Sequence, residues 1–143
     1  MEFKIKSHNT KVKNKSYGKS KLEKAVLDYL YSIYGEDNIN YQYMSIEYPY
    51  NCDYYIKPLK LYIELQAYWT HNNHPYNKNN IDDINILNYW KSKNTKKYND
   101  AIDTWTRRDI EKRECAKRNN INYLEIFSNN INEIKNIIDN IQK

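Results

Sequence analysis

Apolar side chains recur every three or four residues in the first regular segment of this chain, which begins near Ser20. The recurring positions are Leu22, Val26, Tyr29, Leu30 and Ile33. This spacing places them on one face of a helix. Ser20 and Glu23 have the spacing of a capping box, and Gly35 is a suitable stop because glycine readily adopts left-handed backbone. The pattern predicts an amphipathic helix between Ser20 and Gly35.

Three segments rich in tyrosine and isoleucine follow this helix. They cover Ile39–Tyr48, Cys52–Lys57 and Leu61–Gln66, and their composition is typical of strands. Residues 67–80 contain several asparagines, a proline and two histidines, which favours a loop. The middle of the chain is therefore predicted to be a run of three strands followed by a long connection.

The C-terminal half is predicted to contain three helices and one strand. The helices cover about Ile81–Lys91, then Tyr98–Arg118 with a break near Thr104–Thr106, and finally the isoleucines 131, 134, 138 and 141. Asn119-Asn120 is a suitable helix end because asparagine tolerates left-handed backbone, and Ile121–Phe127 is typical of a strand. The resulting order, α-β-β-β-α-α-β-α, predicts an α/β fold with helices packed on a sheet.

The chain has 143 residues, a length suited to one domain with one core. Residues 1–19 hold six lysines and one acid with little apolar periodicity. We expect a basic, flexible arm there, either solvated or bound to phosphates, and a single domain over residues 20–143. Tyr54, Tyr55 and Tyr62 are predicted to fill a sheet face.

The charge and the cysteines narrow the classes of partner and compartment. A net charge of +5 and a pI near 9.0 favour a polyanionic partner, either nucleic acid or an acidic membrane face. No signal peptide is visible, and no apolar run approaches the roughly 20 residues that cross a membrane. Cys52 and Cys115 lack the spacing of a disulfide framework, so we expect free thiols at core or boundary positions and a cytoplasmic protein.

Two acids are predicted to face each other across the second and third strands. If the hairpin is symmetric about Pro58-Leu59, Asp53 lies opposite Glu64. Opposed residues have Cβ atoms about 4.5–5.5 Å apart, where two like charges cost stability. A divalent cation removes this conflict, because Mg²⁺ is commonly held by one or two carboxylates plus waters. The alternative is an exposed acid pair that is solvated or paired with lysines, and spacing alone does not separate the two interpretations.

These residues resemble the motif of a known nuclease superfamily. Glu23 in the first helix, Asp53 after Tyr48-Pro49, and Glu64-Leu65-Gln66 on the next strand are similar to the PD-(D/E)XK pattern, and the αβββαβ order agrees with that core. Leu61–His74 and Trp105–Phe127 further resemble a phage-encoded group related to very-short-patch-repair and homing-type endonucleases.

The resemblance covers about residues 16–128 and has specific implications. It implies a restriction-endonuclease-like αβββαβ core with a mixed central sheet flanked by helices. It also implies a DNA endonuclease that depends on Mg²⁺, for which Mn²⁺ would substitute. Asp53 and Glu64 would be metal ligands, with the Leu65 backbone carbonyl as a third, and Glu23 would orient a water or bind a second ion.

Gln66 departs from the family pattern, which usually has lysine at this position. Glutamine carries no charge and can only form hydrogen bonds or orient water. The superfamily contains active members with glutamine here. The missing positive charge would then come from His71 or from a basic residue on the helix of residues 107–118.

Residues after the third strand have two open interpretations. The resemblance assigns His71 to phosphate contact or acid–base work and Trp69 to stacking on DNA, whereas the alternative is a surface histidine and a packing tryptophan. His71 and His74 have the spacing of two zinc ligands. Zinc needs two more, and only the distant Cys52 and Cys115 are available, so we do not expect a zinc site.

The segment Arg107–Arg118 has more bases than acids, which favours contact with a phosphate backbone. The candidate DNA-binding residues are Arg107, Arg108, Lys112 and Arg113. The alternative is a solvent-exposed helix whose acids and bases form ion pairs with one another. Thr106 and Asp109 are predicted to cap the start of this helix.

The leading hypothesis is therefore a Mg²⁺-dependent DNA endonuclease, monomeric or homodimeric, that does not act at a membrane. It would work in the cytoplasm, or in that of the host if phage-encoded. Two alternatives stay open. One is a DNA-binding module that kept the fold but lost full activity, which Gln66 keeps plausible. The other is an RNA-directed nuclease with the same chemistry.

Overall fold

The computed structural model describes residues 20–141, so the basic arm predicted over residues 1–19 lies outside the described residues. Helix α2 (Lys21–Tyr34) begins directly after Ser20, whose hydroxyl accepts the Glu23 N–H at 3.1 Å. It ends at Gly35, which has φ +87°. Both ends of the first helix therefore lie where the sequence predicts them.

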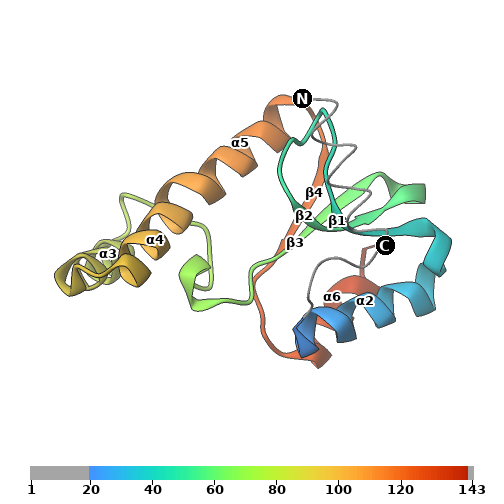
Figure 1. Cartoon of the computed structure of the whole chain (residues 1–143), viewed down its shortest axis with the longest axis horizontal. Coiled ribbons are helices and arrows are strands. Elements are labelled where there is room, and N and C mark those ends of the chain that lie inside the picture. The colour runs from blue at the N-terminus through green and yellow to red at the C-terminus, as the bar shows by residue number, and fades with distance from the viewer. Residues whose placement is uncertain (1–19, 142–143) are drawn as a thin grey trace.

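The sheet has four strands in the order β1-β2-β3-β4. They are β1 (Ile39–Tyr43), β2 (Cys52–Ile56), β3 (Leu61–Leu65) and β4 (Asn122–Ile126). The first three form an antiparallel meander, and β4 runs parallel to β3 (Figure 1). The prediction of a mixed sheet flanked by helices is thus confirmed at the level of an α/β architecture.

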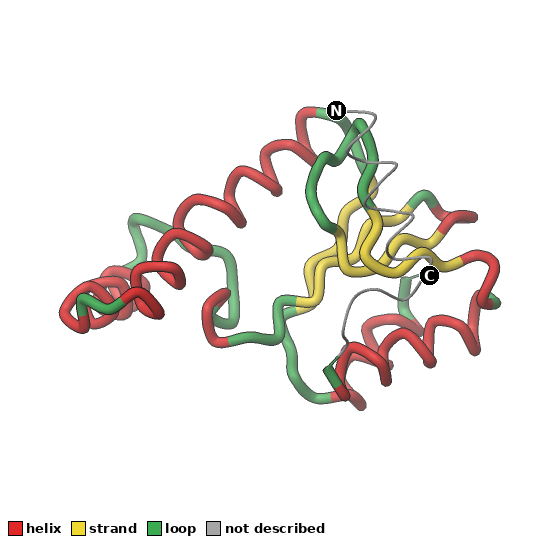
Figure 2. The backbone as a smooth tube through the Cα atoms, in the orientation of Figure 1, coloured by secondary structure: helices red, strands yellow, loops and turns green. Residues whose placement is uncertain are grey.

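Helices cover both faces of the sheet. On one face, α2 and α6 (Ile131–Asp139) lie side by side and form the main core with the strands (Figure 2). On the other face, Cys115 of α5 (Asp109–Arg118) packs with Tyr48, Cys52 and Tyr62. Cys52, Cys115, Tyr54 and Tyr62 are buried, as predicted, and Tyr55 is half-buried.

The predicted strand Ile39–Tyr48 is wrong in its second half, because β1 ends at Tyr43. Beyond it, the Ser45 N–H donates to the Tyr48 carbonyl at 3.3 Å, and the Ser45 hydroxyl accepts the Tyr48 N–H at 3.0 Å. These bonds close a turn that extended backbone could not form. The turn brings Tyr48 back over the sheet, where its ring is fully buried.

Strands β1 and β2 change face partway along their length. The pair Tyr41–Tyr54 packs in the core below α2, whereas the next pair, Tyr43–Cys52, packs on the side of α5. In a regular strand, residues two apart share a face. Gln42, between the pairs, has φ +58°, and this left-handed residue accompanies the change. Opposite it on β2 stands Asp53.

A helical hairpin projects from the sheet (Figure 1). It consists of α3 (Ile81–Lys93) and α4 (Lys96–Asp103), joined through Asn94 in left-handed conformation. It has a small core of its own, formed by Trp90, Ala101 and Trp105. In the part of the chain that the structure describes, no helix is both long and apolar enough to cross a membrane.

A π-helical turn over Thr104–Arg108 joins the hairpin to α5, at the position where the sequence predicts a break. The predicted cap at Thr106 and Asp109 is wrong. The Thr106 hydroxyl donates to the Ile102 carbonyl at 2.6 Å, and Asp109 is buried inside a continuous helical path. No helix begins at this point, because the helical backbone is continuous from α4 to α5.

We predict that Gly35→Ala destabilises the protein by about 1–3 kcal/mol, because residues with a Cβ rarely adopt its backbone conformation. The added Cβ would meet only Asn38 Nδ2 at 3.9 Å, an ordinary contact, so the cost is one of backbone strain. Urea denaturation measures this difference. Ser32→Ala, in the same helix, serves as the control and should change stability by less than about 0.5 kcal/mol. Equal stability of the two variants would contradict the prediction.

Candidate active site

The β2–β3 hairpin has the register predicted from symmetry about its turn. Tyr55 pairs with Tyr62, and Tyr54 pairs with Ile63. The regular pairing ends there, one position before Asp53. The two predicted acids, Asp53 and Glu64, are the next residues of β2 and β3 beyond the last regular pair.

Asp53 and Glu64 are held at these strand ends by hydrogen bonds to each other's strand. The Asp53 carboxylate accepts the Leu65 N–H at 2.7 Å, and the Glu64 carboxylate accepts the Asp53 N–H at 3.2 Å. These bonds replace the backbone pairing that the ladder would have made. The structure therefore brings the two predicted acids together, although not as a regular cross-strand pair.

Asp53 opens onto a pocket of about 200 Å³. It is lined by Ser20, Leu22, Glu23, Asp53, Leu65, Ala67, Tyr68 and Asn129. Glu23 is oriented by the Tyr41 hydroxyl, which donates to its carboxylate at 2.6 Å. The predicted helix acid and the predicted strand acid thus share one concave surface.

The pKa of Asp53 lies well above its ordinary range. Burial is the main cause, and the neighbouring charge of Glu64 adds to it. The hydrogen bond from the Leu65 N–H acts in the opposite direction but is outweighed. Asp53 therefore binds a proton more readily than an exposed aspartate does, and a cation placed beside it would take over that role.

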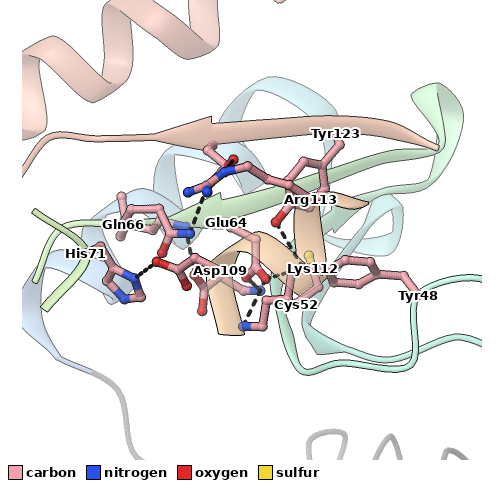
Figure 3. Close-up of polar contacts among 12 residues, drawn as sticks. Tyr48, Cys52, Glu64, Gln66, His71, Asp109, Lys112, Arg113 and Tyr123 are labelled. Carbon is pink, nitrogen blue, oxygen red and sulfur yellow. Dashed lines mark hydrogen bonds and ion pairs between the residues drawn. The ribbon is translucent and has the colours of Figure 1, made fainter. Parts of the chain in front are cut away.

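Glu64 is only 2% exposed. One of its carboxylate oxygens accepts the Asp53 N–H, and the other lies toward Tyr48 and Lys112 of α5 (Figure 3). The Tyr48 hydroxyl donates to it at 2.6 Å, and the Lys112 Nζ lies 3.4 Å from the same oxygen. Burial and the Glu64 charge raise the pKa of Tyr48, so this donor keeps its proton. The Tyr48 and Tyr123 hydroxyls lie 3.0 Å apart and extend the network.

Lys112 is the cation of this cluster. Its side chain is 24% exposed and reaches inward from α5 to Glu64. Burial alone would lower its pKa, but the charges of Glu64, Asp53 and Asp109 outweigh that effect and raise it. Lys112 therefore remains an ammonium. The sequence predicts it as a DNA contact and also predicts that His71 or a basic residue of this helix supplies the charge missing at Gln66.

Gln66 does not replace the missing lysine in any direct way. Its side-chain amide donates to Glu125 at 3.1 Å, and Arg113 Nη2 donates to the same carboxylate at 2.9 Å (Figure 3). Arg113, predicted to contact DNA, is thus engaged in an ion pair with a core strand. The positive charge near the acids comes from Lys112 instead.

His71 is paired with a buried carboxylate. Its Nδ1 lies 2.7 Å from Asp109 Oδ2, and Asp109 is only 1% exposed (Figure 3). A proton on Nδ1 satisfies this bond, which leaves Nε2 as the acceptor of a neutral ring. Among the described residues, the second oxygen of Asp109 has no hydrogen-bond partner. Asp109 thus orients His71 and adds negative charge near Lys112.

The two histidines of the H-x-x-H pattern bind different carboxylates. His74 Nε2 lies 2.6 Å from Asp83, a fully buried residue at the start of α3. The Asp83 carboxylate also accepts the Asn77 N–H at 2.9 Å. His74 therefore anchors the loop to the helical hairpin, whereas His71 belongs to the site.

The remaining predicted DNA contacts lie on the surface beyond the cluster. Arg107 bonds Asp103 and Glu111 within its own helical path, and Arg108 Nε lies 3.2 Å from Asp103. Both arginines keep about half or more of their side chain exposed. Trp69 is 39% exposed and packs edge-on against Trp90.

The donor set fits a hard divalent cation held partly by water. Within the described residues, no three His, Cys, Asp or Glu side chains form a ready-made ligand set. Magnesium, however, needs only one or two carboxylates plus waters, and Asp53 with Glu64 can supply them. Among residues 20–141, the carboxylates of Asp53, Glu64 and Asp109 act on one ammonium, that of Lys112, so the cluster has an excess of negative charge. A bound cation would balance it.

The sequence analysis did not predict the contacts of four residues of the cluster. Two of them, Tyr48 and Glu125, were not predicted as site residues, and the other two, Asp109 and Lys112, were predicted in other roles. The helix carried a usable signal, because Asp109, Lys112 and Ala116 are spaced along one face. The sequence instead predicts a helix cap for Asp109 and a DNA contact for Lys112. Tyr48 had no such signal, because its position depends on the turn after β1.

Comparisons with known proteins give no further assignment. No protein-family model, curated protein or solved structure matches this chain. The cluster of Asp53, Glu64, Lys112 and the His71–Asp109 pair is therefore interpreted from its own chemistry.

We predict that Asp53→Asn stabilises the metal-free protein at neutral pH. The pKa of Asp53 is higher in the folded than in the unfolded protein, so ionising this carboxyl lowers the free energy of unfolding. This loss of stability is absent well below the ordinary pKa of 3.8 and grows as the pH rises toward the raised pKa. Asparagine cannot ionise, yet its oxygen can still accept the Leu65 N–H.

Thermal denaturation in EDTA from about pH 4 to pH 8 measures this effect. The stability difference between Asp53→Asn and the parent should be small at the acidic end and grow with pH. Asp28→Asn, at an exposed position of α2, is the matched control and should follow the parent. Identical pH profiles for Asp53→Asn and the parent would show that Asp53 titrates normally.

Proposed function

We propose that this protein is a metal-dependent nuclease that hydrolyses phosphodiester bonds of DNA at the open end of the β2–β3 hairpin. The observation that carries the proposal is the pair of acids at adjacent strand ends with a half-buried ammonium, that of Lys112, beside them. The strand arrangement supports it, because three antiparallel strands followed by a parallel fourth agree with the expected nuclease core.

Asp53 and Glu64 would hold the Mg²⁺ or Mn²⁺ ion, and the Leu65 carbonyl is the candidate third ligand. When bound, the ion would lower the pKa of a water molecule and offset negative charge on the reacting phosphate. The raised pKa of Asp53 supports this role, since a carboxylate pair that binds a proton readily is also a pair that gains from a cation.

Lys112 would stabilise the charge that develops on the phosphate. Its ammonium is preorganised by Glu64 and by the field of Asp53, and burial strengthens its interaction with an anion. In this proposal Lys112 does from α5 what lysine at position 66 does in the related nucleases. Gln66, bound to Glu125, contributes alignment of β3 and β4 instead.

His71 would accept a proton or contact the phosphate, and Glu23 would orient a water molecule. Asp109 holds the His71 ring by Nδ1, so Nε2 can accept a proton or contact a phosphate oxygen. Glu23, fixed by Tyr41 at the wall of the pocket, can accept a hydrogen bond from a water there. Each residue acts from a separate element, which is why the site depends on the whole fold.

The proposed substrate is DNA because the chain is basic and two exposed arginines lie in the π-helical turn directly before α5. The net charge is +5, and Arg107 and Arg108 keep exposed guanidinium groups near the end of the helix that carries Lys112. Gln66 favours one alternative, a DNA-binding module without activity, since it leaves the usual lysine position uncharged.

We predict that Lys112→Gln lowers plasmid nicking by about 100-fold or more, the scale expected for loss of one preorganised charge at the reacting group. Asp53→Asn and Glu64→Gln should abolish nicking in Mg²⁺ or Mn²⁺ while retaining the fold. Lys117→Gln, an exposed lysine on the same helix, is the matched control and should retain activity.

The outcomes of this assay separate the candidate functions. Nicking that persists in both Asp53→Asn and Glu64→Gln would rule out the proposed site. A parent protein that binds DNA but leaves it intact with either metal would identify the inactive binding module. Faster cleavage of RNA than of DNA under the same conditions would make the protein a ribonuclease.

A further inference from the structure

One face of the helical hairpin carries a row of aromatic rings. The Trp69 and Tyr98 ring centroids lie 5.3 Å apart, and those of Tyr98 and Tyr89 lie 6.4 Å apart. Lys97 Nζ lies 5.4 Å from the Trp69 ring, and Lys93 Nζ lies 4.8 Å from the Tyr89 ring. We call Trp69, Tyr98 and Tyr89 the aromatic row.

The two outer members of this row are partly exposed to solvent. Tyr89 is 55% exposed and Trp69 is 39% exposed. The hairpin already has a core in Trp90 and Trp105, which are 6% and 0% exposed. Exposed aromatic side chains that form one contiguous surface commonly mark an interaction site.

The charges beside the row are not balanced by acids. Within the described residues, neither Lys93 nor Lys97 has a carboxylate within ion-pair distance, whereas the neighbouring Lys96 pairs with Asp100 at 2.7 Å. Each of the two ammonium groups instead lies over a ring. A partner that offers both an anion and a flat π surface would therefore satisfy lysines and rings together.

The row begins next to the candidate active site. Trp69 and His71 belong to the same short 3₁₀ turn, and His71 is paired with Asp109 at the start of α5. Tyr98 belongs to α4 and Tyr89 to α3, and both helices lie away from the sheet (Figure 1). A ligand bound at the Trp69 end of the row would lie within one helical turn of His71.

We propose that the aromatic row binds an unpaired nucleic-acid strand, with bases stacked on its rings and phosphates bound by Lys93 and Lys97. Every base has a π face, so such stacking tolerates any sequence. In a duplex the base faces are covered by their neighbours and cannot reach the rings. A stacked base is held more strongly than an exposed ammonium over the same ring, so the lysine is displaced and becomes available to the phosphate.

This inference rests on the proposed function for its choice of ligand and narrows the substrate to DNA that contains a single-stranded segment. Binding by the row needs neither a metal nor cleavage. The strand interaction can therefore be measured apart from catalysis, and the failure of one does not imply the failure of the other.

The test measures the fluorescence anisotropy of a labelled oligo-thymidine strand, and of a duplex of equal length, in EDTA. Tyr89→Ala should weaken binding of the strand about tenfold through lost stacking, while Tyr89→Phe should restore it. Lys93→Gln should make the negative slope of log affinity against log salt less steep by about 0.7, the change expected for the loss of one phosphate contact to a single strand.

The matched control is Lys135→Gln, because Lys135 Nζ lies 5.1 Å from the Tyr29 ring in a similar pair on the far side of the sheet. It removes the same charge from the same type of contact and should leave strand binding unchanged. An equal loss in Lys135→Gln and Lys93→Gln would overturn the proposal, as would Tyr89→Ala binding the strand like the parent. Equal sensitivity of duplex binding to Tyr89→Ala would overturn it as well.

Discussion

The site depends on one electrostatic constraint, the burial of two carboxylates at neighbouring strand ends. Asp53 and Glu64 tolerate each other because each accepts a backbone N–H from the opposite strand, and because Tyr48 and Lys112 bind Glu64. Removing any of these partners would leave a buried charge uncompensated, which is costly in a protein interior. The turn after β1 and the position of α5 are therefore tied to the same pair of acids.

The same constraint explains how a glutamine can stand at position 66. The Gln66 side chain is directed to Glu125, whose carboxylate already binds Arg113. Positive charge enters the cluster from α5, and Gln66 is used to join β3 and β4 through Glu125. We infer that the charge requirement of the site is met across the fold rather than along one strand.

The helical hairpin and the sheet have separate roles in the proposed function. The hairpin is stabilised by its own tryptophan core and held to the site through the His74–Asp83 contact and the turn that carries Trp69 and His71. Trp69 and Tyr89 remain partly exposed outside that core. In the proposed function, the sheet and α5 carry the chemistry, and the hairpin guides the strand toward it.

The sequence by itself determined the elements that follow from local periodicity and backbone chemistry: the capped helix from Ser20 to Gly35, the β2–β3 register and the buried tyrosines. It also singled out Asp53 and Glu64 by their spacing. Only the tertiary structure decided that β1 and β2 change face beside Gln42, that Asp109 turns inward to His71, and that Lys112 reaches Glu64. These contacts join residues tens of positions apart, and periodicity reports only how a segment is patterned, not which distant charge it meets.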